Sequence, residues 1–546
     1  MPETSNLISH IYLKIGGQDM PEEFMRALVE TQVENSLHLP DVATLKLNDP
    51  KLTWIDDSRL VPGKTLEISS KSSARRSKDG VIFDGEIVEV EPHFGASTQH
   101  LTIRAFDRLH RLARGRRVRT FLNVTDGDIA TQFAKEAGLE GDIAATRIVH
   151  PYLLQYNQTN LEFLRERASA IGYMVYVLGK KLCFKPPASV GTPIELRWGE
   201  SLQEFNPRLT TLGQVNKVTA RGWDPRARQE IIATVSKAKG FPDVQIPQKG
   251  GDAAKNAFGI EAEHLVVSQP LRTQASADHL AQSVADRIVE RFVEADGMCG
   301  GNPAIVAGAS ITVDAVGDQF KGTYFVTNAT HIYGADGYST HFIVSGQSPT
   351  DLLSLIRQSE AVVPSSGLVI GIVTDNQDPE GMGRIKVKYP WLSSEHASDW
   401  ARVVAPGAGP ERGMEFLPEI DDEVLVAFEM GDIHFPYIVG GLWNGKDALP
   451  KKNNAVISGG KVKERIIRSR TGHLIVLNDD DGGGGITIED KNGNKIVLDT
   501  SSNGVTIQLK GKLLLKTQGD IEIDGASIKL NAQGEVKVTG SVINLN

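Results

Sequence analysis

The last eighty residues of the chain constrain its fold most strongly. They repeat short segments that carry Ile, Val or Leu at alternate positions, and Gly, Asn or Asp separates one segment from the next. Alternation with a period of two predicts β-strands with one apolar face. The segments are ITIED, KIVLDT, VTIQL, LLLKT, DIEIDG, SIKLN, EVKVTG and INLN.

This repeat contains no helix and no second sheet that could cover the apolar stripe. In a single chain the stripe and the strand edges would therefore remain exposed to solvent. Three chains can wrap so that their stripes meet on an axis, and burial at about 25 cal/mol per Å² then favours the trimer. We therefore predict an intertwined triple-stranded β-helix in a homotrimer; a single-chain β-solenoid is the alternative. The predicted core of this needle is Ile496, Leu498, Val505, Ile507, Leu509, Ile521, Ile523, Ile528, Leu530, Val536, Val538, Ile543 and Leu545.

The bulk composition indicates an ordinary soluble protein with several domains. The chain has 546 residues, 40% hydrophobic and 23% charged, which is too long for one hydrophobic core. Its net charge of -9 gives no drive toward nucleic acid. The start of the sequence lacks the pattern of a secretory signal, and no stretch approaches the length of a membrane span. Cys183 and Cys299 form no CxxC pair, so we expect two buried free thiols rather than a disulfide.

The first two-thirds of the chain read as mainly β with a few helices. Period-2 runs predict a first barrel-like domain over residues 1–115. Capping patterns at Thr125 and Thr159 predict two helices in an insert over 116–185. A second barrel-like domain, 186–350, is expected to carry a helix with Leu280, Val284, Ile288 and Phe292 on its inner face.

The rest of the chain divides into four parts. Residues 351–366 are predicted to be a linker, on the run VVPSSG that begins at Val362. Five short strands over 367–450 are typical of a five-stranded barrel of the OB type. Residues 451–464 form a connector, and the needle covers 465–546.

Several segments in this order resemble the hub-and-spike family of contractile injection systems, which includes the VgrG proteins of type VI secretion and the spikes of contractile phage tails. Residues 106–139 resemble the family's hub segment, and QYNQTNLEFLRERASAIGYMVYV (155–177) is similar to its Y-x-x-T/S-x-L-x-F-L-x-R helix. ARGWDPRARQEI (220–231) matches its G-W-D-P turn. GIVTDNQDPEGMGRIKVKYPWL (371–392) resembles the phage-spike OB domain, and RSRTGHLIVLNDDD (468–481) the entry to the needle. The N-terminal region resembles hubs of phages and of extracellular contractile particles more closely than it resembles typical type VI spikes.

The resemblance implies a partner at each end of the molecule. The two barrels of three chains would form a pseudo-sixfold hub that contacts the inner tube and the baseplate, and effector cargo could travel with it. The sequence ends in GSVINLN without a His-x-His pair, so we expect a separate PAAR-type tip protein to bind Ile543, Asn544, Leu545 and Asn546. The resemblance also implies synthesis in the bacterial cytoplasm without a signal peptide and a place in a phage tail-like particle, cytoplasmic or released extracellularly.

The sequence carries no enzyme motif: we find no HExxH, no GxSxG and no P-loop. We therefore expect a structural protein with no cofactor and no metal. Two alternatives stay open: an envelope-degrading hydrolase carried on a spike, whose paired carboxylates have no fixed spacing, and a type VI secretion VgrG. We expect no toxin domain after the needle segment and no lysozyme-sized insert before it.

Two charged segments admit a second interpretation. Asp479, Asp480 and Asp481 precede four glycines and could bind calcium, but a loop at the base of the needle is the favoured interpretation. A basic stretch could bind nucleic acid, yet few aromatic residues lie near it, so we favour an interface that pairs with acidic neighbours or with the tube. Its arginines are Arg104, Arg108, Arg111, Arg114, Arg116, Arg117 and Arg119.

Overall fold

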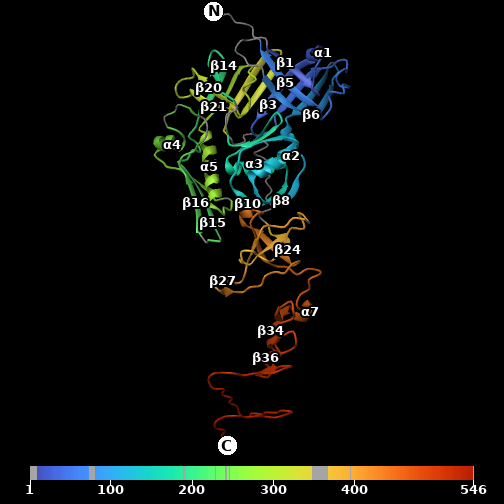
Figure 1. Ribbon diagram of the computed structural model, residues 1–546, viewed down its shortest axis with the longest axis vertical. Coiled ribbons are helices and arrows are strands. Elements are labelled where there is room, and N and C mark those ends of the chain that lie inside the picture. The colour runs from blue at the N-terminus through green and yellow to red at the C-terminus, as the bar shows by residue number, and fades with distance from the viewer. Residues whose placement is uncertain are drawn as a thin grey trace, which may run out of the picture. The chain divides into compact units, whose positions relative to one another are not determined.

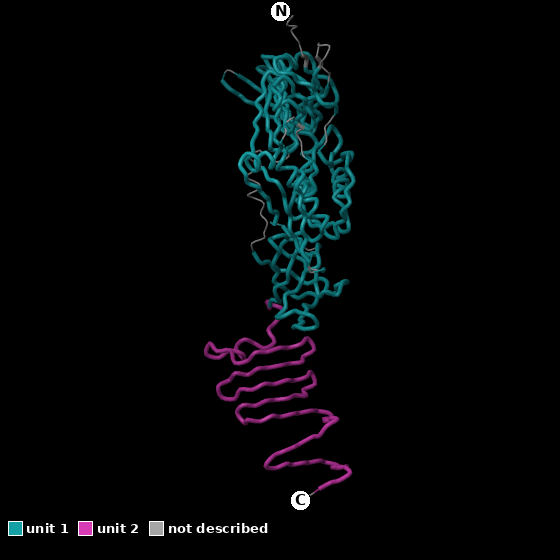
Figure 2. Tube along the Cα trace, turned by 90° about the vertical axis from the view of Figure 1, so that its left-hand side faces the viewer, with its two compact units in different colours: residues 1–442 teal, residues 443–546 magenta. Residues whose placement is uncertain are grey.

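The computed structural model describes residues 9–72, 80–96, 98–187, 191–224, 226–227, 229–239, 243–244, 246, 248–267, 269–346, 367–393 and 395–544. The chain divides into two compact units, residues 1–442 and 443–546, which Figure 2 colours teal and magenta. Strands dominate both units, which confirms the expectation of a mainly β protein with a few helices. The predicted linker, 351–366, lies outside the described residues. Within those residues no helix is long and apolar enough to cross a membrane.

An eleven-stranded sheet forms the N-terminal part of the first unit. Its strands come from both regions that the sequence predicts as hub barrels. In spatial order they are β14 (Leu202–Leu209), β19 (Val293–Gly300), β23 (Gly337–Val344), β22 (Asn328–Gly334), β3 (Leu28–Ser36), β4 (Val42–Asn48), β7 (Gln99–Phe106), β6 (Gly80–Phe94), β5 (Thr65–Ser72), β1 (Ser9–Ile15) and β2 (Gln18–Asp19).

The two hub regions join where β22 pairs with β3. The strands run antiparallel, and His331 lies opposite Val33. Each side of the junction has its own apolar core: Leu45, Leu47 and Ile103 belong to the first, and Phe342 belongs to the second. The hub regions are therefore continuous in hydrogen bonding, although the blue and yellow strands of Figure 1 lie far apart in the sequence.

Three smaller groups complete this hub. β13 (Ile194–Arg197), β20 (Ser310–Asp314), β21 (Gly322–Phe325) and β17 (Asp243–Val244) form a four-stranded sheet. α1 (Glu22–Ala27) buries Phe24 against Trp54, with ring centroids 5.0 Å apart. β16 (Gln229–Val235), β15 (Lys217–Asp224) and β18 (Glu263–Val266) form a sheet beside α4 (Gly250–Phe258) and α5 (Gln274–Glu290).

The predicted capping motifs both form. Thr125 caps α2 (Asp126–Glu136) and Thr159 caps α3 (Asn160–Ile171), each in a reciprocal capping box. β8 (Arg117–Thr125) and β10 (Val149–Gln158) pair beside these helices, and η1 (Arg108–Ala113) precedes β8. A separate three-stranded sheet has the order β11 (Met174–Leu178), β12 (Lys181–Lys185) and β9 (Glu140–Ile143). The core here stacks Phe121 on Phe163, with centroids 5.7 Å apart.

α5 differs from its prediction at one residue. Leu280 is buried on its inner face as expected, but the helix ends at Glu290, so Phe292 follows it and packs in the neighbouring core. Both cysteines are free and buried, as the sequence predicts. Burial raises the pKa of Cys183 to about 11 and that of Cys299 to about 12, which keeps both thiols protonated and unreactive at neutral pH.

The five predicted OB strands close into a barrel in the order β24 (Val369–Asp375), β25 (Arg384–Lys388), β26 (Ala401–Val403), β30 (Pro436–Gly441) and β29 (Glu423–Phe428). Val373, Ile385, Val424 and Ile438 fill its core. A small hairpin, β27 (Ala408–Gly409) with β28 (Arg412–Gly413), and η2 (Glu429–Gly431) lie in its loops. The barrel is the last element of the first unit.

The second unit contains a serpentine sheet. After α7 (Asn453–Val456), β31 (Ile457–Ser458) and β32 (Lys461–Val462), five antiparallel strands follow in sequence order: β33 (Glu464–Arg468), β34 (Leu474–Asn478), β35 (Gly485–Glu489), β36 (Lys495–Asp499) and β37 (Gly504–Gln508). Three predicted strands, ITIED, KIVLDT and VTIQL, coincide with β35, β36 and β37. Residues 509–544 form no strand within the single chain, and Figure 2 shows the magenta trace crossing back and forth there. The expected strands of this stretch therefore lack a hydrogen-bonding partner in their own chain.

Candidate functional site

The five-stranded sheet of the second unit presents an apolar ladder on one face. Antiparallel register places isoleucines of neighbouring strands directly opposite one another. The first column of this ladder is Ile467, Ile475, Ile488, Ile496 and Ile507, and the second is Leu477, Ile486, Leu498 and Val505. Side chains opposite one another across an antiparallel pair contact each other, so each column forms one continuous apolar strip.

The same register gives the other face a mixed character. Its central column reads Ile466, Val476, Thr487, Val497 and Thr506. Charged residues flank that column, with Glu489 opposite Lys495. Because successive residues of a strand point to opposite faces, the sequence places most of its larger aliphatic side chains on the ladder face and its threonines on the other.

The ladder is exposed to solvent in the single chain. Ile475 and Ile486, in its centre, are each 38% exposed, and Ile507 is 51% exposed. Fully burying one such side chain is worth about 1.5–3 kcal/mol. A contiguous apolar surface of this length marks an interaction site.

The predicted needle core can now be placed residue by residue. Ile496, Leu498, Val505 and Ile507 belong to the ladder. The others that the structure describes are exposed large hydrophobic side chains beyond the sheet, and Leu545 lies outside the described residues. These exposed members are Leu509, Ile521, Ile523, Ile528, Leu530, Val536, Val538 and Ile543.

Sequence reasoning missed the first rungs of the ladder. Ile475 and Leu477 on β34 and Ile486 and Ile488 on β35 share the register of the predicted core. Their signal is the same alternation, LIVLN and ITIED. Of the predicted tip residues, Ile543 is exposed and Asn544 ends the described chain, while Leu545 and Asn546 lie outside it.

The basic stretch near the start of the helical region is bound largely within its own chain. Arg104 pairs with Glu89 at 2.9 Å, Arg108 with Asp84 at 2.9 Å, and Arg119 with Glu136 at 2.8 Å. Two more of its arginines form ion pairs in the same way: Arg111 with Glu86, and Arg116 with Glu162. These five arginines thus pair with acidic residues of their own chain, and the predicted interface with other chains or with the tube stays a prediction.

The three aspartates at the base of the sheet also face basic side chains. Lys463 lies 3.2 Å from Asp480 and Lys461 3.1 Å from Asp481, while Arg465 pairs with Asp479. Among the described residues no group of three or more His, Cys, Asp or Glu side chains is arranged to hold a metal ion. The contacts favour a loop held by ion pairs.

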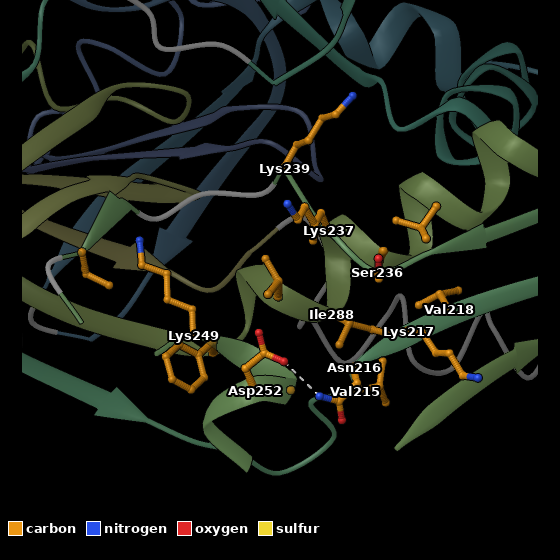
Figure 3. A pocket seen from close by; sticks show the side chains of 17 residues that line it. Val215, Asn216, Lys217, Val218, Ser236, Lys237, Lys239, Lys249, Asp252 and Ile288 are labelled. Carbon is orange, nitrogen blue, oxygen red and sulfur yellow. Dashed lines mark hydrogen bonds between the residues drawn. The ribbon is translucent and has the colours of Figure 1, made fainter. Parts of the chain in front are cut away.

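A cavity of about 560 Å³ lies between β15, the end of β16 and the helices α4 and α5. Figure 3 shows Lys237, Lys239 and Lys249 around it and Asp252 accepting a hydrogen bond from the Asn216 side chain at 3.1 Å. Asp252 is the one carboxylate among the described residues that line it. The usual hydrolysis of a glycosidic bond uses two carboxyl groups, and this cavity offers a single one.

Three family models match the chain. Residues 6–334, more than half of it, match the Alg8 N-terminal domain. Residues 369–443 match the type VI secretion system/phage-baseplate injector OB domain, which covers the five-stranded barrel. Residues 464–546 match the phage baseplate V C-terminal trimerisation domain, which begins at β33.

Parts of the chain are similar in sequence to spike proteins of type VI secretion systems. The chain is 30% identical to the type VI secretion system spike protein VgrG1b of Pseudomonas aeruginosa over 154 residues, 25% of this chain and 20% of that protein. It is 34% identical to VgrG1a of the same organism over 104 residues, 18% of this chain and 16% of the relative. The chain thus spans a fifth or less of the length of these relatives.

One solved structure resembles nearly the whole fold. A chain of the Francisella PdpA-VgrG complex, half-lidded, matches 92% of this chain and 88% of its own length with a TM-score of 0.53 at 10% identity. The OB barrel and the C-terminal strands each match a family model of phage baseplates, in the order that the sequence predicts. The chain belongs to the VgrG-like hub-and-spike family of phage baseplates and type VI secretion systems, and its N-terminal region is of the Alg8 type.

Proposed function

We propose that this protein is the structural central spike and hub of a contractile injection system. Residues 1–350 form the hub, which adapts a threefold needle to a sixfold tube. The OB domain, 367–450, links the hub to the needle of residues 465–546. Contraction of a sheath drives the assembly forward, and the needle transmits the force to a target envelope.

The exposed ladder carries this proposal. Its two columns, represented by Ile488 and Ile486, are too apolar to remain in water along a whole sheet. Three such sheets bury their ladders against one another around an axis, and residues 509–544 gain strand partners only from the other two chains. The match of 464–546 to a trimerisation domain supports the same arrangement.

Partners at the two ends complete the proposed assembly. A PAAR-type tip protein binds the end of the needle through Ile543, Asn544, Leu545 and Asn546, because a blunt trimer of strands leaves hydrogen-bonding edges that need a cover. The inner tube and the baseplate contact the hub. The proposed assembly also carries a cargo protein, since one similar structure is a complex of VgrG with PdpA.

We infer that the chain is not itself an enzyme. The cavity beside α5 presents one carboxylate, Asp252, which is already bound to Asn216. Purified trimer incubated with peptidoglycan should release no soluble fragments. Release that disappears on changing one carboxylate would instead establish the envelope hydrolase.

The decisive experiment compares two adjacent residues of β37. Ile507 lies in the ladder and Thr506 on the opposite face. Ile507→Asp should abolish the trimer, because three charges would meet in the apolar core, while Thr506→Asp should leave it intact. Light scattering of the full-length proteins measures both, and normal trimers of Ile507→Asp would refute the buried ladder.

A type VI secretion spike is the second candidate, favoured by the likeness to VgrG1b and VgrG1a. The two candidates share the trimer and differ in the machine that surrounds it. Electron microscopy of particles purified through a tagged chain separates them: free sheathed particles support an extracellular or phage-type device, and recovery with a membrane complex supports type VI secretion.

A further inference from the structure

The hub and the OB barrel of the first unit meet along β10. Leu154, only 2% exposed, is part of the barrel's core cluster. The hydroxyl of Tyr152 donates a hydrogen bond to the carbonyl of Ala397 at 2.9 Å, and Tyr156 packs edge-on against Trp391. The junction is therefore a packed interface rather than a loose tether.

His434 lies at the centre of this junction, in the turn that precedes β30. Its Nδ1 is 2.7 Å from a carboxylate oxygen of Asp432, and its Nε2 is 3.2 Å from the carbonyl oxygen of Leu154. The imidazole thus bridges a barrel loop and a hub strand. Its side chain is 20% exposed, so protons can still reach it from water.

Both partners of the His434 ring are hydrogen-bond acceptors. A neutral imidazole carries one N–H and can satisfy only one of them, whereas the imidazolium donates from both nitrogens. Deprotonation therefore leaves a lone pair facing either the carboxylate or the Leu154 carbonyl. Only a protonated ring can donate to both acceptors at once.

The charged groups around His434 are consistent with a protonated ring. Burial raises the pKa of Asp432, but hydrogen bonding and charge from His434, with the more distant Arg167 of α3, outweigh it and lower the pKa, so the carboxylate is ionised. Arg167 in turn binds Asp126 at 2.7 Å and His150 at 2.9 Å. From β10 the group facing His434 is the ring of Tyr152, at 6.5 Å between centroids. On η2, Glu429 is already paired with Arg272.

We propose that His434 is a proton-dependent clamp between the hub and the OB barrel, closed when the ring is protonated and weakened when it is neutral. Histidine changes charge between about pH 5 and pH 8 in proteins. The junction should therefore be tighter in mildly acidic solution than in mildly alkaline solution.

Hydrogen exchange of the full-length trimer tests the clamp. Peptides covering 150–156 and 430–437 are followed at pH 6 and pH 8, with exchange corrected for its intrinsic pH dependence. Loss of one charge-assisted hydrogen bond should reduce protection about tenfold at pH 8. His434→Gln should lower protection at pH 6 and remove the pH dependence.

A matched control exists in the same interface. His396 also lies at the junction, with its Nδ1 3.4 Å from the hydroxyl of Thr120, and His396→Gln should keep the pH dependence of the wild type. Asp432→Asn should reduce the dependence, which gives a second route if His434→Gln folds poorly. Equal protection at both pH values in the wild type, or an unchanged pH dependence in both His434→Gln and Asp432→Asn, would overturn the proposal.

Discussion

Ile488 and Ile496 lie directly opposite one another on the adjacent antiparallel strands β35 and β36, yet they are 47% and 39% exposed. A cross-strand pair of this kind holds two strands in register but cannot bury itself. The pair repeats in both directions along the sheet, so the unburied area grows with each strand. Stability of this unit must therefore come from surfaces outside the single chain.

The ladder predicts that substitutions on its face of the sheet lower the free energy of unfolding more than substitutions on the opposite face. Ile496→Ala should lower the free energy of unfolding of the trimeric needle by about 2–5 kcal/mol per chain, the usual cost of deleting a buried isoleucine side chain. Thr487→Ala, on the opposite face, should cost about 1 kcal/mol or less. Urea unfolding at one fixed trimer concentration measures both, and equal losses would contradict the assignment of faces.

Local sequence patterns predicted the local elements of this fold. The capping boxes at Thr125 and Thr159 formed because their partners, Asp128 and Glu162, lie three residues away. The five barrel strands and the ladder strands likewise follow from alternation within a few residues. All residues that such a pattern requires lie within a few positions of one another in the sequence, so the sequence alone is enough to predict the element.

The features that escaped prediction depend on distant partners. The pairing of His331 with Val33 joins two regions that appear separate in the sequence, and no local pattern encodes that register. The clamp at His434 likewise needs Leu154, from a different domain. The predicted strands after Gln508 are unpaired within one chain because the partners that we propose for them lie in other chains.

The guanidinium of Arg119 ties together the helical region. It donates to Gln155 at 2.8 Å, to Glu136 at 2.8 Å and to Asn160 at 2.9 Å, and it lies 4.7 Å from the ring centre of Phe133. Arg119→Met should destabilise this region by about 2–4 kcal/mol, because the buried acceptors lose their donor. The measurement is urea-dependent hydrogen exchange of α2 and α3.

An exposed ion pair supplies the control for Arg119. Arg26 and Glu22 pair on the surface of α1, where their side chains are 73% and 78% exposed. Arg26→Met should change the stability of the hub by about 0.5 kcal/mol or less. A similar loss in both variants would mean that charge rather than the buried network sets the effect.

Asp378 organises the loop between β24 and β25. Its carboxylate accepts bonds from the backbone amides of Glu380 and Met382 and from the guanidinium of Arg384, and the bond from Arg384 is the main reason that its pKa lies well below its usual range. A lowered pKa contributes stability above the ordinary pKa of about 4, which is lost as pH falls through the folded value.

Asp378→Asn should therefore destabilise the OB barrel at pH 7 by about 1–3 kcal/mol, and the difference from the wild type should shrink toward pH 2. Asp375→Asn is the matched control, because Asp375 accepts one backbone bond, from Gln377. Hydrogen exchange of the barrel strands in urea gives the free energies. A difference that stays constant with pH would contradict the role of the charge.

The turn between β3 and β4 predicts the opposite pH dependence. Burial raises the pKa of Asp41 to about 7, against hydrogen bonds from the backbone of Ser36 and the side chain of Asn35 that lower it. Asp107, whose amide bonds the carbonyl of Asp41, has its pKa raised by burial and by the neighbouring Asp41 charge. The folded hub therefore holds a proton that the unfolded chain releases between about pH 4 and pH 7.

Stability of the hub should consequently fall as pH rises through this window, by about 1.4 kcal/mol per pH unit for each proton held. Asp41→Asn should make the profile less steep, since it removes one of the two carboxyl groups whose pKa is raised. Asp57→Asn should not flatten it, because the bond from Arg59 lowers the pKa of Asp57 and its titration ends below the window. Urea unfolding of the hub between pH 4.5 and pH 7.5 tests this, and an equal slope in the wild type and Asp41→Asn would show that the proton resides elsewhere.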